Sequence, residues 1–337
     1  MKIAIVGAGA VGGLVGAKLA LAGEQVTFLV RGASLAAVRA NGVRLVMGDG
    51  SEHVAGHVTA TDDYAAAGPQ DLVILAVKAH QMQSIAQDVP KLFGADTVVV
   101  TMQNGIPYWY FHRHSGPLAG SVIHSVDPEG LIARQITPGR VIGCVVFAAA
   151  ERSAPGVIRH LEGDRFAVGE LDGSHTARVK QVSQAFTHAG LDSPVLDDIR
   201  AELWLKLWGN LAFNPISALS RATLADICEH PPTRELVERM MGEGEQVARA
   251  LGVRFGITLA ERIEAARRVG QHRSSMLQDV EAGREPEFEA VVGSVVELGR
   301  LTNVSTPTID GVYALSGLLA RSLVERKRSS GIRHLPE

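Results

Sequence analysis

The chain has 337 residues, which is enough for two domains of ordinary size. Its 46% hydrophobic and 20% charged residues are typical of a globular protein, and a formal net charge of −3 excludes a strongly basic surface for nucleic acid or anionic lipid. Cys144 and Cys228 are far apart and form neither a disulfide framework nor a zinc motif. No stretch approaches the ~18 apolar residues of a membrane span, and glycines interrupt the apolar start, unlike in a signal peptide. We therefore expect a cytoplasmic protein without nucleic-acid or membrane partners.

The first half alternates short apolar runs with helical segments. The predicted strands are 2–6, 25–30, 71–77 and 97–102, and the first helix is 10–22. Continuous apolar strands separated by helices indicate an α/β fold with a doubly wound parallel sheet of the Rossmann type. Such sheets bind ligands at the carboxyl ends of their strands, where the loops beginning at Lys78 and Gln103 lie.

Turns and then helices follow along the rest of the chain. Between 121 and 170 we expect strands broken by turns at Pro138-Gly139, Pro155-Gly156 and Gly163-Asp164. After that the pattern is helical, with these signals: Asp197 as the cap of a helix 198–211, a helix from Thr233 to Leu251, a capping box of Thr258 with Glu261, and Pro286 and Pro307 in the first turns of two later helices. We predict a Rossmann domain at 1–196, an all-helical substrate domain at 197–330 and a tail at 331–337.

A glycine-rich motif follows the first strand and opens the first helix. It consists of Gly7, Ala8, Gly9, Ala10, Val11 and Gly12. In such a motif the first glycine permits a tight turn, the second lets the backbone approach a pyrophosphate, and the third lets helix and strand pack closely. A glycine-rich turn without a ligand is the alternative, but the complete strand–turn–helix context favours a dinucleotide site.

The end of the second strand bears on the choice of dinucleotide. NAD enzymes usually place an acid there to bind the ribose hydroxyls, but no acidic residue occurs between Gln25 and Gly48. Arg31 stands at this position instead, with Ser34 nearby, and a guanidinium suits a 2′-phosphate better than an ordinary ribose. The sequence therefore predicts NADPH/NADP+, with Lys78 as a second phosphate or ribose contact.

A polar stripe runs along the first helix of the second half. Lys206, Asn210 and Asn214 recur at intervals of four, so they share one face of an otherwise apolar helix. Such a stripe is either a solvated edge or the floor of a polar pocket, and two asparagines in register with the lysine favour the pocket. A lysine ammonium there could polarise a ketone and donate the proton that follows hydride transfer.

These residues resemble the ketopantoate reductase (2-dehydropantoate 2-reductase) family over nearly the whole chain. The matching stretches are the glycine motif, Lys78-Ala79-x-Gln81, Asn104-Gly105, Arg200-Ala-Glu-Leu-Trp-x-Lys206-Leu with Asn210 and Asn214, and Ser274-Ser-Met-Leu-Gln-Asp279 followed by Glu287. The resemblance implies NADPH-dependent reduction of 2-dehydropantoate to pantoate, a step of pantothenate biosynthesis. It also implies a small 2-keto acid as partner, and a homodimer is compatible with it.

The resemblance also assigns roles to residues. Lys206 would be the general acid, and Glu287 would pair with it and position it. Asn210 and Asn214 would bind substrate hydroxyl groups, and Ser275 would bind the substrate carboxylate. Asn104 would lie between the cofactor ribose and the substrate. Lys78 and Gln81 would contact the cofactor. From the residues alone, a helix cap is the preferred interpretation of Ser275, and a first-turn glutamate stabilised by the helix dipole is the preferred interpretation of Glu287.

Two departures from the compact family members leave the substrate open. The segment 106–141 is longer and carries His112, His114, His124 and Asp127, whose spacing matches no metal motif, so no metal is expected. His272 stands where those members have a substrate-binding asparagine. Both changes fall near the expected substrate, so a sister reductase of another 2-keto acid is the main alternative. A non-catalytic NADPH-binding sensor is a third reading, which degraded catalytic positions would favour.

Overall fold

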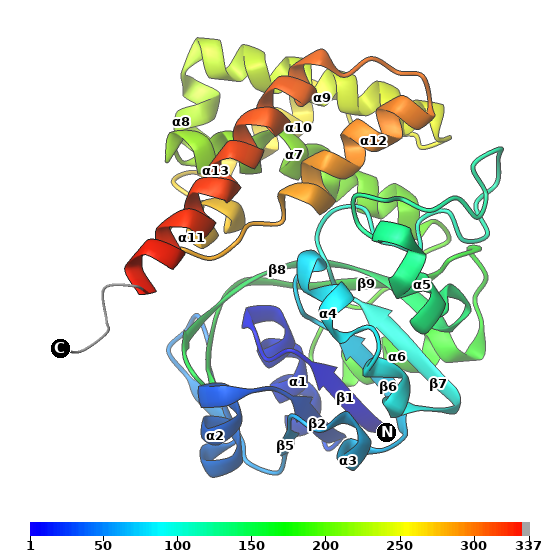
Figure 1. Ribbon diagram of the computed structural model, residues 1–337. Coiled ribbons are helices and arrows are strands. Elements are labelled where there is room, and N and C mark those ends of the chain that lie inside the picture. The colour runs from blue at the N-terminus through cyan, green and yellow to red at the C-terminus, as the bar shows by residue number, and fades with distance from the viewer. Residues whose placement is uncertain (332–337) are drawn as a thin grey trace. The chain divides into compact units, whose positions relative to one another are not determined.

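The computed structural model describes residues 1–331, with side chains described for 1–326 (Figure 1). Its residues fall into two compact units, each described here by itself. Unit 1 comprises Met1–Gln103, Tyr108–Val122 and Glu129–Arg200, and unit 2 comprises Asn104–Pro107, Ile123–Pro128 and the chain from Ala201 onward. Two short loops from the first half of the chain therefore belong to the second unit. Of the expected tail, all but Gly331 lies outside the described residues.

Unit 1 is built on one large sheet, in the order β4-β3-β9-β8-β7-β6-β1-β2-β5. Its strands are β1 (Lys2–Val6), β2 (Gln25–Leu29), β3 (Val43–Val46), β4 (Glu52–Ala55), β5 (Thr59–Thr61), β6 (Gln70–Leu75), β7 (Phe93–Thr101), β8 (Val141–Ala154) and β9 (Val157–Glu170). The pairs β3–β4 and β8–β9 are antiparallel and the other neighbours are parallel. The parallel centre is the Rossmann-type sheet that the apolar runs predict.

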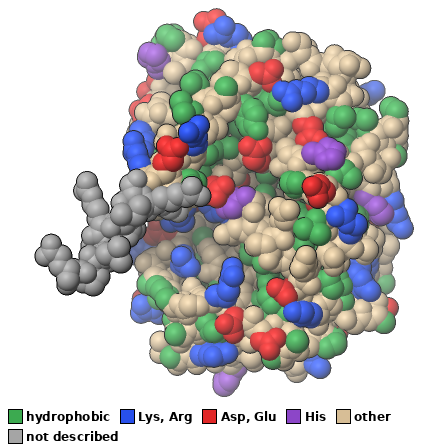
Figure 2. All heavy atoms as spheres, in the orientation of Figure 1, with side chains coloured by type: hydrophobic (Ala, Val, Ile, Leu, Met, Phe, Trp, Pro, Cys, Tyr) green, Lys and Arg blue, Asp and Glu red, His purple; other side chains and the backbone are tan. Residues whose placement is uncertain are grey.

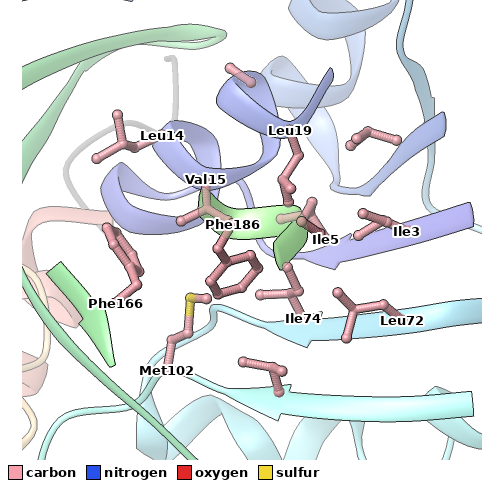
Figure 3. Packing of buried hydrophobic residues seen from close by; sticks show 14 of the residues in the cluster. Ile3, Ile5, Leu14, Val15, Leu19, Leu72, Ile74, Met102, Phe166 and Phe186 are labelled. Carbon is pink, nitrogen blue, oxygen red and sulfur yellow. The ribbon is translucent and has the colours of Figure 1, made fainter. Parts of the chain in front are cut away.

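Helices cover this sheet. They are α1 (Ala10–Leu21), α2 (Gly32–Asn41), α3 (Tyr64–Ala67), α4 (Met82–Ile85), α5 (Leu131–Gln135) and α6 (Ala177–His188), with shorter 3₁₀ turns at η1 (Ala79–Gln81), η2 (Val89–Leu92), η3 (Pro128–Gly130) and η4 (Pro138–Arg140). The helix α1 packs against β1, β2, β3, β4, β8 and β9, so it is buried along most of its length. Figure 3 shows Leu14, Val15 and Leu19 of α1 above Ile5 of β1 and Ile74 of β6, with Phe186 of α6 beside them.

The regular secondary structure in the described part of unit 2 is entirely helical. Its elements are α7 (Ile199–Ser220), whose first two residues belong to unit 1, α8 (Leu224–Glu229), α9 (Pro231–Ala250), α10 (Leu259–Arg268), α11 (Ser275–Glu281), the π-helical turn η5 (Glu289–Gly293), α12 (Ser294–Leu301) and α13 (Pro307–Gly331). The helix α9 is central, because it packs against α8, α10, α12 and α13. The expected fold class, a Rossmann-type sheet followed by helices, is confirmed.

Two local expectations between residues 121 and 170 were wrong. Residues 121–140 contain turns and short helices instead of strands. Only Pro155-Gly156 turns the chain between strands, because β8 and β9 form one long hairpin (Figure 1). Gly163 lies inside β9 with φ +72°, beside a register shift at Phe147, so this glycine makes a bulge instead of a turn.

The helix α7 was expected to end at Leu211, but it continues through Pro215 to Ser220. A proline inside a helix costs ~3 kcal/mol. The residues on both sides of it offset this cost, since Leu211, Phe213 and Ile216 are at most 4% exposed. The cap was also misassigned, because the backbone N–H of Arg200 donates to the carboxylate of Asp198 (3.0 Å) and not to Asp197.

Other helix ends are closer to expectation. The capping box of Thr258 with Glu261 is present, and Pro307 opens α13. The helix α9 begins at Pro231, two residues before Thr233, and Pro286 precedes its helix instead of lying in the first turn. None of the described helices is long and apolar enough to cross a bilayer.

Candidate active site

The glycine motif forms a tight turn between β1 and α1 in unit 1. Gly7 has φ +97°, and a Cβ there would lie 2.8 Å from Cγ1 of Val77. A Cβ on Gly12 would lie 2.1 Å from the carbonyl oxygen of Gly7 and 2.7 Å from Cβ of Ala76. Gly9 differs, because a Cβ there meets nothing within 4 Å. The outer glycines therefore close the turn, and the middle one faces open space where a ligand can approach the backbone.

The first turn of α1 is suited to an anion. Gly9 is its N-cap, with no side-chain hydrogen bond to the cap and no acid in the first turn. The backbone N–H of Gly13 is bonded within the helix (2.9 Å to the Gly9 carbonyl oxygen), while the N–H groups before it have no partner in a regular helix. Unpaired N–H donors at the positive end of the helix dipole fit the pyrophosphate of a dinucleotide.

Arg31 is the N-cap residue of α2, two residues after the end of β2, and its side chain is exposed. The first turn of α2 holds no acid, so nothing there competes with an anion for this guanidinium. This placement agrees with the sequence expectation of an arginine at the end of the second strand.

The loop after β6 is held by two amide side chains. The side-chain oxygen of Gln81 accepts from the backbone N–H of Lys78 (3.2 Å), so Gln81 closes the turn that carries the lysine. Nε2 of Gln103 donates to the carbonyl oxygens of Leu75 (2.8 Å) and Val77 (2.9 Å). Gln103 thus ties the end of β7 to the loop after β6, a positioning role that the sequence pattern does not reveal.

The polar stripe of α7 lies in unit 2. Lys206 and Asn210 are half-buried and Asn214 is buried, whereas Trp204 and Trp208 are fully buried on the opposite side of the helix. The indole N–H of Trp208 donates to the Met241 carbonyl oxygen (2.8 Å), which fixes that side against α9. A half-buried lysine with partners is unlike a solvated helix edge.

Asn104 joins the lysine to the glutamate. Nζ of Lys206 donates to Oδ1 of Asn104 (2.7 Å), and Nδ2 of Asn104 donates to Oε2 of Glu287 (3.3 Å). All three residues belong to unit 2, although 183 positions separate Asn104 from Glu287. An amide cannot ionise, so Asn104 orients the ammonium and the carboxylate through hydrogen bonds of fixed direction.

The backbone around Asn104 explains this placement. Gly105 has φ +83°, and a Cβ on it would lie 2.0 Å from the carbonyl oxygen of Ala290. The N–H of Ile106 donates to that same oxygen (2.9 Å), which lies in the π-helical turn η5. Such turns alter the regular helical hydrogen bonding and often occur at functional sites. Since residue spacing gives no sign of it, this contact could not be found from the sequence.

The two serines at the start of α11 have different roles. Ser274 is the N-cap, 2% exposed, and its hydroxyl accepts from the N–H of Leu277 (3.1 Å). Ser275 is the next residue and is exposed. The capping function therefore belongs to Ser274, which removes the cap as an explanation of Ser275. His272 is half-buried, and its carbonyl oxygen accepts from the N–H of Leu224 (3.1 Å).

The long segment after β7 is organised by Arg200. Its guanidinium donates to the carbonyl oxygens of Tyr110 (2.7 Å), His112 (2.6 Å) and Leu171 (2.5 Å). Burial lowers the pKa of Arg200, and these three carbonyls compensate for lost hydration. The histidines divide between the units, because His112 and His114 belong to unit 1 and His124 belongs to unit 2.

A pocket of about 270 Å³ lies beside Arg200 in unit 1. Its lining includes Arg113 and Asp172, which form an ion pair (2.6 Å), and hydrogen bonds from Ser174 lower the pKa of Asp172 to about 2. None of the predicted site residues lines this pocket.

Comparison with known proteins gives matches over both halves of the chain. The model described as "Ketopantoate reductase PanE/ApbA" matches residues 3–173, and its C-terminal counterpart matches residues 198–320. A 2-dehydropantoate 2-reductase from Mesorhizobium japonicum is 51% identical over 95% of this chain and 98% of its own length.

Solved structures agree. A candidate ketopantoate reductase from Ralstonia solanacearum is 40% identical, covers 95% of this chain and 98% of its own, and superposes with a TM-score of 0.91. A D-mandelate dehydrogenase bound to NADH and anilino(oxo)acetate is 22% identical, covers 96% of this chain and 99% of its own, and has a TM-score of 0.82. The second similarity shows a shared fold only.

Proposed function

The chain belongs to the ketopantoate reductase family and is an oxidoreductase acting on a CH–OH group, and on this premise we propose that it reduces 2-dehydropantoate to pantoate with NADPH. The observation that carries the proposal is the hydrogen bond from Lys206 to Asn104, whose amide in turn binds Glu287. This arrangement gives a half-buried ammonium a fixed direction, as a positioned proton donor requires.

The proposed chemistry needs one hydride and one proton. The bound dinucleotide would supply the hydride to the keto carbon of the substrate. Lys206 would use a remaining N–H to polarise the keto oxygen and would then give up its proton, so the product leaves as an alcohol and the lysine as a neutral amine. Glu287 would act through Asn104 by keeping the ammonium in place.

The remaining polar groups of unit 2 would hold the substrate. Asn210 and Asn214 follow Lys206 at one-turn intervals, so they can bind the hydroxyl end of the keto acid while the lysine meets its keto group. Ser275 would bind the carboxylate, and its exposed hydroxyl, distinct from the cap at Ser274, supports this role. His272 would lie against the substrate in place of an asparagine.

The cofactor part of the proposal rests mainly on unit 1, and Asn104 of unit 2 is added to it. The turn from Gly7 to Gly12 would hold the pyrophosphate and Arg31 the 2′-phosphate, with Lys78 and Gln81 nearby and Asn104 at the nicotinamide ribose. We correspondingly assign residues 1–196 to cofactor binding and 197–330 to substrate binding and catalysis.

The test is a substrate panel followed through the loss of NADPH absorbance. It should contain ketopantoate, 2-ketoisovalerate, oxaloacetate and benzoylformate, and we expect the highest kcat/KM with ketopantoate. Arg31→Ala should raise KM for NADPH while changing KM for NADH little. Wild-type enzyme that uses both cofactors equally would refute the NADPH assignment.

A sister reductase of another 2-keto acid is the second candidate, and His272 favours it. An imidazole is larger than an asparagine side chain and donates differently, so it can select a different substrate. A clear preference in the same panel for a keto acid other than ketopantoate would establish this alternative. The homodimer and the cytoplasmic location remain predictions, and light scattering after size-exclusion chromatography tests the first.

A further inference from the structure

We propose that Arg152, at the far end of the β8–β9 hairpin, is a second residue that recognises the adenosine 2′-phosphate, together with Arg31 and Ser34. The inference rests on the proposed use of NADPH and adds to it a residue from a distant part of the sequence. Every group involved lies in unit 1.

The first observation is a contact between the hairpin and the helix after β2. Nη1 of Arg152 donates to Oγ of Ser34 (3.2 Å), although the residues are 118 positions apart. Ser34 is the third residue of α2, and Arg31 is its N-cap. One guanidinium, one hydroxyl and a second guanidinium therefore gather at the N-terminus of α2, where the end of β2 would receive the adenosine ribose.

The second observation is the face of the hairpin on which Arg152 lies. Arg152 pairs with Ile158 across the hairpin, so their side chains share a face. Ile158 packs against Gly13 of α1, because a Cβ on Gly13 would lie 2.6 Å from its Cδ1. Arg152 thus belongs to the hairpin face that covers the helix of the glycine motif, on the side where a dinucleotide would bind.

Charge is the third observation. Glu151 is the neighbouring acid, but successive residues of a strand point to opposite faces, and Glu151 is paired with Arg159 (3.8 Å). Among the residues whose side chains are described, neither Arg31 nor Arg152 forms an ion pair with a carboxylate. A phosphate dianion that accepted N–H groups from both arginines would supply the counter-ion that the described carboxylates do not.

The backbone holds the hairpin end in place without help from Arg152. The N–H of Arg44 donates to the carbonyl oxygen of Gly156 (2.8 Å), and β3 pairs with the start of β9. In Figure 1 the curved hairpin bends towards α2 at this end. Because these contacts already fix the hairpin, removing the Arg152 side chain should leave the fold intact.

The experiment compares Arg152→Ala with Arg159→Ala, an exposed arginine of the same hairpin that is paired with Glu151. We expect Arg152→Ala to lower the NADPH/NADH ratio of kcat/KM about tenfold, the lower range for a hydrogen bond to a charged group. It should weaken binding of 2′,5′-ADP by a similar factor and binding of 5′-AMP much less. Arg159→Ala should leave both ratios near wild type, and Arg152→Lys should restore part of the preference.

The outcomes separate this inference from the function it rests on. If the wild type binds 2′,5′-ADP no more tightly than 5′-AMP, the NADPH assignment fails, and the inference fails with it. If the wild type prefers NADPH, and if Arg31→Ala removes that preference while Arg152→Ala keeps it, only the inference about Arg152 is overturned. Equal losses with NADPH and NADH in Arg152→Ala, or a lowered Tm, would show a structural tie to Ser34 and would also overturn it.

Discussion

At the scale of single residues, the candidate site depends on one amide that links two charged groups. Asn104 accepts from Lys206 and donates to Glu287, so it uses both ends of its side chain at once. An aspartate there would attract the lysine but repel the glutamate, and a leucine would leave both without this partner. In the proposed mechanism the neutral amide would direct the ammonium towards the substrate without neutralising it.

The role of Lys206 can be measured directly. Lys206→Ala should lower kcat by roughly 10²–10⁴, the range for a positioned proton donor, because the product alkoxide then lacks its acid. Glu287→Ala should lower kcat by a smaller factor. The double variant should have a kcat little below that of Lys206→Ala, since the two residues are expected to act as one unit. Lys180→Ala, on the exposed face of α6, is the control. A Lys206→Ala enzyme that keeps most of its kcat would contradict the assignment.

The adjacent serines of α11 give a matched pair. Ser274→Ala should lower the free energy of unfolding by about 0.5–2 kcal/mol, because it removes the N-cap, with little change in KM. Ser275→Ala should raise KM for the keto acid and leave stability nearly unchanged, because a carboxylate contact exists in ground and transition states alike. Urea unfolding and steady-state kinetics separate the two effects. The same change in both variants would argue against distinct roles.

At the scale of elements, the site depends on how the loop after β7 meets the π-helical turn η5. Gly105 allows this approach through its positive φ and its missing Cβ. Gly105→Ala should therefore destabilise unit 2 and displace Asn104, which would lower kcat. The matched control is Gly252→Ala, whose φ is +86° but whose Cβ would meet nothing within 4 Å.

Both variants incur the cost of an alanine at positive φ, about 1 kcal/mol. Only Gly105→Ala adds the overlap with the Ala290 carbonyl, roughly 1–3 kcal/mol more by analogy with overpacked cores. Differential scanning calorimetry and kcat should show this difference. Equal effects of the two substitutions would mean that the close approach at Gly105 contributes nothing.

The same elements show how far sequence patterns reach. Local signals predicted the β1–α1 turn, the parallel strands and the stripe on α7, because each depends on residues a few positions apart. The extension of α7 past Pro215 was missed, since burial on both sides outweighs the proline. The Asn104–Glu287 contact and the Arg152–Ser34 contact join residues 183 and 118 positions apart, and no local periodicity encodes such pairs.

At the scale of the whole molecule, the net charge is small. Figure 2 shows acidic and basic side chains interspersed on the visible face, and the formal net charge is only −3. We therefore expect recognition of an anionic cofactor to come from local groups such as the α1 N-terminus and Arg31, and not from a long-range field. The affinity for NADP+ should accordingly fall only modestly with salt.

Binding to these local groups should appear in the thermal stability of the full chain. NADP+ at a hundred times its Kd stabilises a native protein by about 2.7 kcal/mol, which corresponds to roughly 5–10 °C in Tm for a unit of this size. If the 2′-phosphate contacts are worth tenfold in affinity, NAD+ at the same concentration should give about half that stabilisation. Because the chain has two units, thermal unfolding does not give a single free energy of unfolding. The quantity compared is therefore the change in Tm that each ligand causes. Arg31→Ala should move the NADP+ shift towards that of NAD+, since this guanidinium would contact only the phosphate that NAD+ lacks. Identical changes in Tm with NADP+ and NAD+ in the wild type would show that the residues at the end of β2 do not recognise the 2′-phosphate.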